Sequence, residues 1–591
     1  MLNQVQHDYR IFMQTIPQKF NETAAKFASR PALKFKYQGA YISLSFAELQ
    51  QRVTVLAKGL KALGVKTKDR LAILSENRSE WIRMDLATLF LGAISIPVHT
   101  TLSSKIIKHI LADSGSKVLL VSNQQNFDKV AAVLADLPEL QTIIYINLDQ
   151  PEQQLAEKII ISLDDVMALG EKSDEQIIDQ SQPDGIASIV YTSGTTAMPK
   201  GVMLTHNNFI FNAEAAVTVV PVTEHDTLLS FLPLTHVLER TAGYYASLVC
   251  RGACLAFAES IKTLGVNLQE VKPTILVSVP RVFEKIHKDI WDKLKAAGGL
   301  KYKIFLWSLK QIPGRWQYRL ADFLVFKKIR AKLGGHFRFT IAGGATLNPK
   351  LARFFSRVGI KILEGYGLTE TAPVVSVNRL NNVRFGTVGS QLPGVEIKIA
   401  PDKEILISGP NVMKGYYNNP ALTAEVIDAE GWFHSGDLGF MDSEGFLTIV
   451  GRKKEMISMS NGKIVWPEQL ELELNNDRFI SQSIVYGDNR SYLTVLIVPN
   501  WQEVSRELEA LGIKSREPDQ LAQEPKLIEL FGQRLEKINE QFADWEKIRE
   551  FRILAREFSQ EKDELTPTLK LRRKTIEQNY QKHFAQMYQA S

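Results

Sequence analysis

The stretch YTSGTTAMPKGVMLTH, Tyr191 to His206, decides how the rest of the chain is interpreted. Hydroxyl and glycine residues fill its first half, a lysine follows, and the apolar segment 186–190 precedes it as a predicted strand. Glycine lets a backbone approach a ligand closely, short hydroxyl side chains form hydrogen bonds, and lysine adds a positive charge. The residues concerned are Thr192, Ser193, Gly194, Thr195, Thr196, Lys200 and Gly201. Such a loop suits a polyphosphate.

The loop is not a Walker-type phosphate loop. That pattern requires Gly before the lysine and Ser or Thr after it, whereas Pro199 and Gly201 flank Lys200 here. A flexible surface turn can share the composition. The order of residues is more particular than a turn requires, so a phosphate site is the prediction.

Length and composition indicate an ordinary globular protein of several domains. The chain has 591 residues, with 45% hydrophobic, 23% charged and 9% aromatic residues. At roughly 150 residues per domain this predicts about four units. There is no apolar run of the roughly 18 residues that a membrane span needs, and the first residues lack a secretory signal pattern, so we expect a cytoplasmic protein. Cys250 and Cys254 are too few for a disulfide framework, and we expect both to be reduced and buried.

The pattern along the chain predicts an α/β fold. Helical and strand patterns alternate over residues 1–185 and again over 186–380, which predicts two doubly wound α/β subdomains with mostly parallel sheets. Short strands and turns over 381–453 predict a small β-rich subdomain. Residues 454–591 read as a smaller α+β C-terminal domain. We therefore expect a large N-terminal domain, 1–453, followed by a mobile C-terminal one.

Three further segments of the first domain carry residues suited to a nucleotide site. FLPLTHVLER places Thr235 and His236 after a strand, where ligands of open α/β sheets bind, although a lone histidine is more often structural. TIAGGATL, Thr340 to Leu347, has a glycine pair that lets a flat ring approach the backbone, and a tight turn would look the same. EGYGLTETAP, Glu364 to Pro373, offers an aromatic ring, a hydroxyl and a carboxylate that could hold Mg²⁺.

The remaining segments lie further along the chain. The segment GWFHSGDLGF contains Asp437, whose carboxylate can accept hydrogen bonds from two hydroxyl groups. The segment GRKKEM follows, with Arg452 and Lys454. ELTPTLKLRRK, Glu564 to Lys574, contains Lys570. A charged turn and a solvated basic run could look similar, so these segments support the others.

Taken in this order, the segments resemble the adenylate-forming superfamily, which includes acyl-CoA synthetases, peptide-synthetase adenylation domains and luciferases. The resemblance runs from about Phe46 to Arg573. It implies binding of ATP and Mg²⁺, formation of an acyl-adenylate and release of pyrophosphate. Where this family commonly has Ser-Gly before its final lysine, Thr568 and Leu569 precede Lys570, a form similar to the long-chain branch and its carrier-protein-using relatives.

The resemblance also assigns residue roles. It implies catalytic roles for Lys570, Glu370, Thr195, Lys200 and His236, with His236 beside the substrate carboxylate and Glu370 holding Mg²⁺. Asp437 would bind the ribose, Arg452 the ribose or a phosphate, and Lys454 would be the hinge for a domain rotation. The other implied nucleotide-binding residues are Thr192, Ser193, Gly194, Thr196, Gly343, Gly344, Ala345, Glu364, Gly365, Tyr366, Gly367 and Thr369. Asn461, Gly462 and Lys463 would line the path of the thiol.

The segment VPRVFEKI, Val279 to Ile286, resembles the long-chain acyl-CoA synthetase group, so the expected substrates are a long-chain fatty acid, ATP and coenzyme A. An acyl-acyl-carrier-protein synthetase is the alternative, since it differs only in the thiol. A serine hydrolase is disfavoured because the chain lacks a Gly-x-Ser-x-Gly elbow. Neither nucleic acid binding nor an oligomeric state is predicted.

Residues 285–332 are unusually basic. They contain 13 Lys or Arg and 3 Asp, a net charge of +10 in a chain whose total is +6. Six Trp and Phe residues lie among these cations. Such a segment suits a transient contact with an anionic membrane surface, at the inner face of the membrane, or with an acidic acyl carrier protein. Most charge runs, however, are only a solvated face above a packed core.

Overall fold

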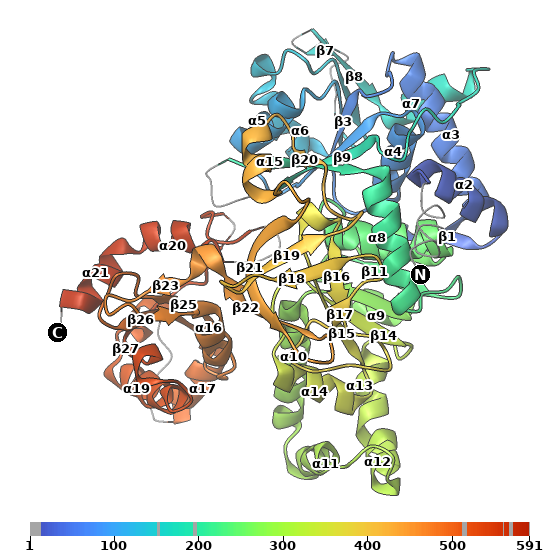
Figure 1. Cartoon of the computed structure of the whole chain (residues 1–591). Coiled ribbons are helices and arrows are strands. Elements are labelled where there is room, and N and C mark those ends of the chain that lie inside the picture. The colour runs from blue at the N-terminus through green and yellow to red at the C-terminus, as the bar shows by residue number, and fades with distance from the viewer. Residues whose placement is uncertain are drawn as a thin grey trace. The chain divides into compact units, whose positions relative to one another are not determined.

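The computed structural model describes residues 14–149, 154–155, 157–192, 198–510, 517–559, 561–566 and 571–589 (Figure 1). The predicted site residues Ser193, Gly194, Thr195, Thr196 and Lys570 lie outside these ranges. The chain divides into two compact units. The first comprises Met1–Lys398, Leu406–His434 and Met441–Leu447, and the second comprises Ile399–Ile405, Ser435–Phe440 and Thr448–Ser591.

The first unit contains two nine-stranded sheets. One has the order β20-β10-β9-β4-β3-β5-β6-β8-β7. Its strands are β3 (Arg70–Leu74), β4 (Ile94–Val98), β5 (Val118–Val121), β6 (Thr142–Tyr145), β7 (Gln154–Leu155), β8 (Lys158–Ser162), β9 (Ile186–Thr192), β10 (Lys200–Thr205) and β20 (Gly415–Tyr416). Strands β4, β3, β5, β6 and β8 are parallel, and every residue of β3 after Arg70 and of β4 and β5 is buried. Burial on both faces accounts for their continuous apolar sequence.

Helices connect these strands as the alternating pattern predicts. They are α3 (Phe46–Ala62), α4 (Ser79–Phe90), α5 (Ser104–Ser114), α6 (Gln124–Ala131) and α7 (Leu163–Glu171). Helix α3 begins with a capping box, in which the Ser45 hydroxyl accepts from the Glu48 backbone N–H and the Glu48 carboxylate accepts from that of Ser45. The residues that α3 buries recur at helical spacing: Phe46, Leu49, Val53, Leu56 and Leu60.

The second sheet has the order β17-β16-β15-β14-β13-β11-β12-β1-β2. Its strands are β1 (Pro31–Tyr37), β2 (Ala40–Ser45), β11 (Thr227–Ser230), β12 (Cys254–Phe257), β13 (Ile275–Ser278), β14 (Phe339–Ala342), β15 (Ile362–Gly367), β16 (Val374–Val377) and β17 (Ser390–Gln391). The sheets do not follow the sequence boundary predicted near residue 185, because β1 and β2 join this second sheet while β9 and β10 belong to the first. Strand β1 pairs in parallel with β12, more than 200 residues later, and such a non-local pairing leaves no local sequence signal.

A buried polar network links the two sheets. It centres on Arg240, in the π-helical segment η3 (Glu239–Val249) that packs against α8 (His206–Val219). The Arg240 guanidinium pairs with Asp85 of α4 and donates to the Ser188 hydroxyl of β9 at 2.7 Å, while the Tyr245 hydroxyl donates to Asp85 at 2.8 Å. Both charged side chains are fully buried, so losing either partner would leave an uncompensated charge in the core. The segment after β11 is thereby fixed relative to β9.

A group of helices follows β13. They are α10 (Pro280–Ala297), α11 (Gly299–Leu309), α12 (Trp316–Ala321), η4 (Asp322–Phe326), α13 (Lys327–Lys332) and, after β14, α14 (Pro349–Val358). Their shared core contains Phe283, Phe305, Phe326 and Phe355. Within the first unit, α11 and α12 lie at the end of this helical group (Figure 1).

The β-rich part forms a four-stranded sheet of order β18-β19-β21-β22. Its strands are β18 (Glu396–Ile399), β19 (Glu404–Ser408), β21 (Phe433–Met441) and β22 (Leu447–Arg452), and the short helix α15 (Pro420–Val426) precedes β21. The strands and turns predicted here are therefore confirmed.

The second unit is α+β, as predicted. Strands β25 (Ile480–Tyr486) and β26 (Leu493–Pro499) pair antiparallel, and β27 (Ile548–Ile553) joins β26 in parallel. A small hairpin, β23 (Ile457–Ser458) and β24 (Ile464–Val465), precedes them. The helices are α16 (Pro467–Asn475), α17 (Trp501–Ala510), α18 (Pro518–Leu521), α19 (Pro525–Asn539), α20 (Arg573–Asn579) and α21 (Gln581–Gln589). Across the described ranges of both units, no helix combines the length and apolar character needed to cross a bilayer.

Candidate active site

The two ends of the predicted phosphate loop are brought together by a hairpin. Strands β9 and β10 pair antiparallel, and Thr192 and Lys200 are direct register partners. The Pro199 carbonyl lies 2.9 Å from Nε2 of His109, on α5. The buried Thr192 hydroxyl has no hydrogen-bond partner among the described residues, so it is available to a ligand.

Lys200 and Glu370, which are 170 residues apart, meet through a tyrosine. The Lys200 ammonium lies 3.4 Å from Oε1 of Glu370. The Tyr416 hydroxyl donates to that same oxygen at 2.9 Å, contacts the Lys200 ammonium, and presents its ring to the ammonium at 3.8 Å from the centroid. Burial and the Glu370 charge hold the pKa of Tyr416 well above its ordinary value, so the hydroxyl keeps its proton. Sequence reasoning missed Tyr416, which lies on the two-residue strand β20 beside β10.

Backbone and side-chain hydrogen bonds fix the turn that carries Glu370. It forms the 3₁₀ segment η5 (Thr369–Thr371), and the Glu370 carbonyl accepts from the Met413 N–H at 2.8 Å. The Thr371 hydroxyl donates to the Pro373 carbonyl at 2.6 Å, and Asn212 of α8 exchanges two hydrogen bonds with the Val374 backbone. Glu370 is therefore held in place before any ligand binds.

The other predicted segments of the first unit meet at one edge of the second sheet. Strands β13, β14 and β15 are parallel, so their carboxyl ends lie together. A Cβ placed on Gly343 would lie 3.3 Å from Leu238 and 3.7 Å from the Gly365 carbonyl, which shows that three predicted segments converge there. Gly344 has a φ of +83°, a left-handed conformation that favours glycine. Ala345 follows it, and Tyr366, Gly367 and Thr369 lie half-buried after β15 begins.

Glu364, another of the predicted nucleotide-binding residues, lies at the start of this edge on β15. Its side chain is buried, and Oε1 has no hydrogen-bond partner among the described residues. Burial raises the pKa of Glu364 to about 8, so the carboxyl is mainly protonated at neutral pH and can donate a hydrogen bond. A neutral donor of this kind suits a ring nitrogen of a base better than a phosphate.

Thr235 and His236 lie after β11, as predicted, and Asn77 positions their loop. Nδ2 of Asn77 donates to the Ser230 hydroxyl and to the Leu232 carbonyl, while its Oδ1 accepts from the Leu234 N–H. Nδ1 of His236 accepts from a backbone N–H at 3.3 Å. The buried Thr235 hydroxyl lacks a partner in the described part of the chain. Asn77 gave no signal in the sequence because it follows β3, far from this loop.

The second unit carries a further cluster. Oδ1 of Asp437, which is buried, pairs with Nε of half-exposed Arg452 at 2.9 Å. Lys454 lies in the short segment η6 (Lys453–Glu455). Asn461 and Gly462 form the turn of the β23–β24 hairpin, and the Lys463 ammonium lies 5.0 Å from the centroid of the Trp545 ring. The two residues expected to contact the ribose thus form one ion pair.

The chain on either side of Lys570 is joined by backbone contacts. Leu565 and Leu571 form an antiparallel bridge, and the Arg572 N–H donates to the Glu564 carbonyl at 2.8 Å. Glu564 is fully buried and accepts two hydrogen bonds from Arg556, at 2.6 and 2.7 Å. This bidentate pair anchors the base of the segment.

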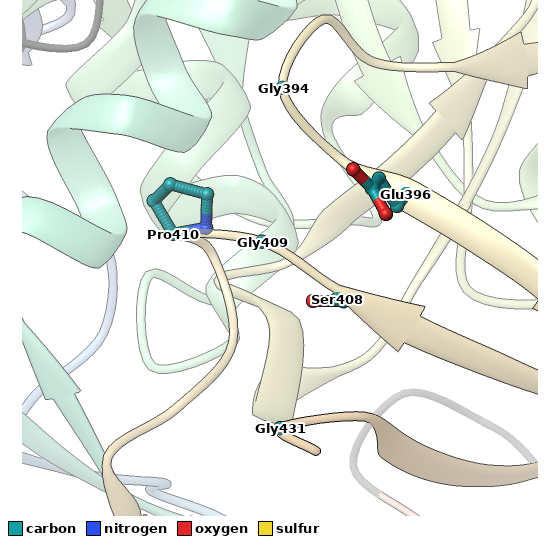
Figure 2. Close-up of a pocket in the computed structure, with 6 residues that line it drawn as sticks. All are labelled: Gly394, Glu396, Ser408, Gly409, Pro410 and Gly431. Carbon is teal, nitrogen blue, oxygen red and sulfur yellow. The ribbon is translucent and has the colours of Figure 1, made fainter. Parts of the chain in front are cut away.

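A shallow cavity lies elsewhere. It has a volume of about 380 Å³ and is lined by Gly394, Glu396, Ser408, Gly409, Pro410 and Gly431 (Figure 2). None of these residues belongs to the predicted site, and Glu396 is the one charged residue among the six. We assign it no part in the chemistry. Both cysteines are buried and free, as predicted.

Known proteins resemble the chain over nearly its whole length. A family model described as AMP-binding enzyme matches residues 20–417, and one described as AMP-binding enzyme C-terminal domain matches residues 454–591. The long-chain-fatty-acid–CoA ligase FadD15 of Mycobacterium bovis is 34% identical over 582 residues, covering 93% of each chain. The human long-chain-fatty-acid–CoA ligase ACSBG2 is 30% identical over 619 residues, covering 97% of this chain and 92% of the relative.

Solved structures support the fold. The A domain of carboxylic acid reductase from Segniliparus rugosus, in complex with AMP and a co-purified carboxylic acid, matches with a TM-score of 0.79 and 21% identity, covering 99% of this chain and 96% of that one. The o-succinylbenzoate coenzyme A synthetase MenE from Bacillus subtilis, in complex with ATP and a magnesium ion, matches with a TM-score of 0.68 and 22% identity, covering 94% and 98%. The resemblance predicted from the sequence is confirmed, and the chain belongs to the AMP-binding enzyme family.

Proposed function

We propose that this protein activates a long-chain fatty acid with ATP and transfers the acyl group to coenzyme A. The chemistry is carried by one observation, the Lys200–Tyr416–Glu370 cluster at the base of the predicted phosphate loop. We infer a long-chain fatty acid as the substrate and coenzyme A as the acyl acceptor from the two relatives described above, both of which are named long-chain-fatty-acid–CoA ligases. A carrier-protein acceptor, the alternative that the sequence left open, gains no support from these names.

The first step makes the carboxyl group reactive. A carboxylate is a poor electrophile because its negative charge is delocalised and it has no adequate leaving group. A carboxylate oxygen therefore attacks the α-phosphorus of ATP, an oxygen–phosphorus bond forms, and the bond to the bridging oxygen breaks so that pyrophosphate leaves. Lys200, the Thr192 hydroxyl and the loop residues 193–196 would bind the pyrophosphate portion, and Lys570 would offset charge at the α-phosphate.

Glu370 is suited to hold Mg²⁺. Nucleotide-bound Mg²⁺ usually takes one or two protein carboxylates and completes its coordination with phosphate oxygens and water. Glu370 supplies one nearly buried carboxylate, and no cluster of three His, Cys, Asp or Glu side chains occurs in the ranges that the structure describes. When bound, Mg²⁺ neutralises charge on the phosphates.

The nucleoside would be recognised by the other segments. We assign the base to Glu364, Tyr366 and the Gly343–Ala345 turn, since the protonated carboxyl can donate to a ring nitrogen and the tyrosine ring can stack on it. Asp437 would accept from the ribose hydroxyl groups while Arg452 keeps its carboxylate oriented. Thr235 and His236 would lie beside the substrate carboxylate.

The second step transfers the acyl group. The sulfur of coenzyme A attacks the carbonyl carbon of the acyl-adenylate, a thioester forms, and AMP leaves. Lys570 serves the first step only, so a rotation about Lys454 between the steps would open a path for the thiol along Asn461, Gly462 and Lys463.

Product analysis tests the assignment. The purified full chain is given ATP, Mg²⁺ and fatty acids of increasing length, with coenzyme A or holo acyl carrier protein in parallel reactions, and products are identified by mass spectrometry. We expect long-chain acyl-CoA and AMP, and loss of both in Lys570→Ala. Formation of acylated carrier protein without any acyl-CoA would contradict the assignment of coenzyme A as the acceptor. Activity confined to short or aromatic acids would contradict the assignment of a long-chain fatty acid as the substrate.

A further inference from the structure

Large apolar side chains are exposed at the end of the helical group in the first unit. Of the 17 large hydrophobic side chains found exposed among the described residues, six lie within residues 300–323, a window of 24 residues. They are Leu300, Trp307, Ile312, Trp316, Leu320 and Phe323. Leu300, Trp316 and Phe323 are 73%, 69% and 68% exposed. We call these six side chains and the cations between them the α11–α12 surface.

The core of the helical group does not use these side chains. Phe305 and Phe326 are fully buried there, and the Trp291 ring packs edge-on against Phe305 at 5.0 Å between centroids. Half of the aromatic residues noted in the basic segment are thus ordinary core, and the remaining half, Trp307, Trp316 and Phe323, are exposed. A concentration of exposed large apolar side chains in one window of the chain indicates an interaction site.

Spacing gathers the exposed side chains on one side of each helix. Leu300 and Trp307 are seven residues apart on α11, which returns a helix to nearly the same face. Leu320 lies four residues after Trp316, and Phe323 three residues after Leu320, along α12 and the start of η4. Figure 1 shows α11 and α12 together at the end of the helical group, and the named side chains of both helices are exposed there.

Unpaired cations surround the apolar side chains. Lys301, Lys303, Lys310, Arg315 and Arg319 are all exposed, and none forms an ion pair within the described part of the chain. The one acidic residue of the window, Asp322, is already paired with Arg330 at 2.6 Å. The surface therefore presents five cations and no free carboxylate to a partner.

We propose that the α11–α12 surface docks the protein on an anionic lipid membrane. Interfacial membrane helices typically place Trp and Phe at the level of the lipid headgroups with Lys and Arg beside them. The five unpaired cations of the surface are complementary in charge to anionic lipid. The inference goes beyond the proposed reaction, because the docking needs no substrate.

Vesicle co-sedimentation of the full chain tests the proposal without any substrate. Vesicles of phosphatidylcholine alone are compared with vesicles containing 30 mol% phosphatidylglycerol, each at low and high salt. We expect binding to the anionic vesicles that weakens with salt. The variant Lys301→Glu/Lys303→Glu/Lys310→Glu/Arg319→Glu should lower the partition coefficient at least about a hundredfold, since each cation contributes roughly fivefold.

Two further variants separate charge from insertion. The matched control Lys66→Glu/Lys105→Glu/Lys172→Glu/Lys262→Glu makes the same change of charge at four exposed lysines outside the surface and should bind far more tightly than the surface variant. Trp316→Ser/Phe323→Ser should weaken binding about tenfold, because two aromatic side chains are lost from the interface.

Two results would overturn the proposal. Equal losses in the surface variant and its matched control would mean that only net charge matters. Absence of vesicle binding, together with binding of an acidic holo acyl carrier protein that the surface variant abolishes, would assign the surface to a carrier protein instead.

Discussion

Replacement of Tyr416 by Phe removes a single hydroxyl group from the centre of the first unit's cluster. The Phe ring would keep its position over the Lys200 ammonium, 3.8 Å from the ring centroid in the wild type. The change deletes the hydrogen bond to Glu370 at 2.9 Å and the hydroxyl that the Lys200 ammonium contacts. Glu370 is nearly buried, so water replaces the lost donor poorly.

The size of the effect follows from the charge on the acceptor. A hydrogen bond to a charged group contributes about 1.5–3 kcal/mol. At about 1.4 kcal/mol per decade, Tyr416→Phe should lower kcat/KM by roughly tenfold to a hundredfold. We expect most of the loss in kcat, because the hydroxyl positions Lys200 and Glu370 for the charge that develops on the leaving pyrophosphate.

Tyr417→Phe is the matched control. The Tyr417 ring packs against the apolar core of the first sheet, and its hydroxyl forms no hydrogen bond among the described residues. Fatty-acid-dependent pyrophosphate release is measured for both variants across ATP concentrations. If Tyr416→Phe stays within twofold of the wild type, or if both variants lose equal activity, the positioning role of Tyr416 is wrong.

Three further changes test other parts of the structure. Burial raises the pKa of Glu239 from 4.5 to about 8, so ionisation of this carboxyl destabilises the folded wild type. Glu239→Gln cannot ionise, so its free energy of unfolding relative to the wild type should increase as pH rises from about 4.5 and level off above about 8. Urea unfolding at several pH values measures this difference. Gly367→Ala would place its Cβ 1.7 Å from the Pro373 carbonyl oxygen, so the turn must shift and activity should fall more than tenfold, whereas wild-type activity would contradict the tight contact. Asp437→Asn should raise the KM for ATP at least fivefold, because the carboxylate is proposed to bind the ribose. The urea midpoint should change little, because the partner Arg452 is half-exposed and such ion pairs contribute at most about 1 kcal/mol to stability. An unchanged KM would refute the ribose role.

Local patterns predicted the elements well. The alternation of helices and strands predicted over residues 1–185 is confirmed by β3 to β8 and the helices that connect them, and α3 begins at Phe46 because Ser45 and Glu48 form a capping box. Periodicity and capping act within a few residues of chain, so a single sequence records them.

Non-local arrangements were not predictable in the same way. Strands β1 and β2 belong to the second sheet, and β9 and β10 belong to the first, contrary to the boundary predicted near residue 185. This arrangement depends on pairing between strands that are distant in the sequence. Tyr416 lies 216 residues from Lys200 and 46 from Glu370, and nothing in its own short strand distinguishes it from Tyr417. Composition likewise could not separate the buried aromatic residues of the basic segment from the exposed ones, since both lie among the same lysines and arginines.

Exchange of labelled pyrophosphate into ATP, measured without coenzyme A, tests the central claim most directly. The exchange requires reversible formation of an acyl-adenylate, so it isolates the first step from the acceptor. We predict exchange that depends on both Mg²⁺ and a long-chain fatty acid, is abolished by Glu370→Ala, and falls at least tenfold in Tyr416→Phe. Production of acyl-CoA without any such exchange would contradict the acyl-adenylate route.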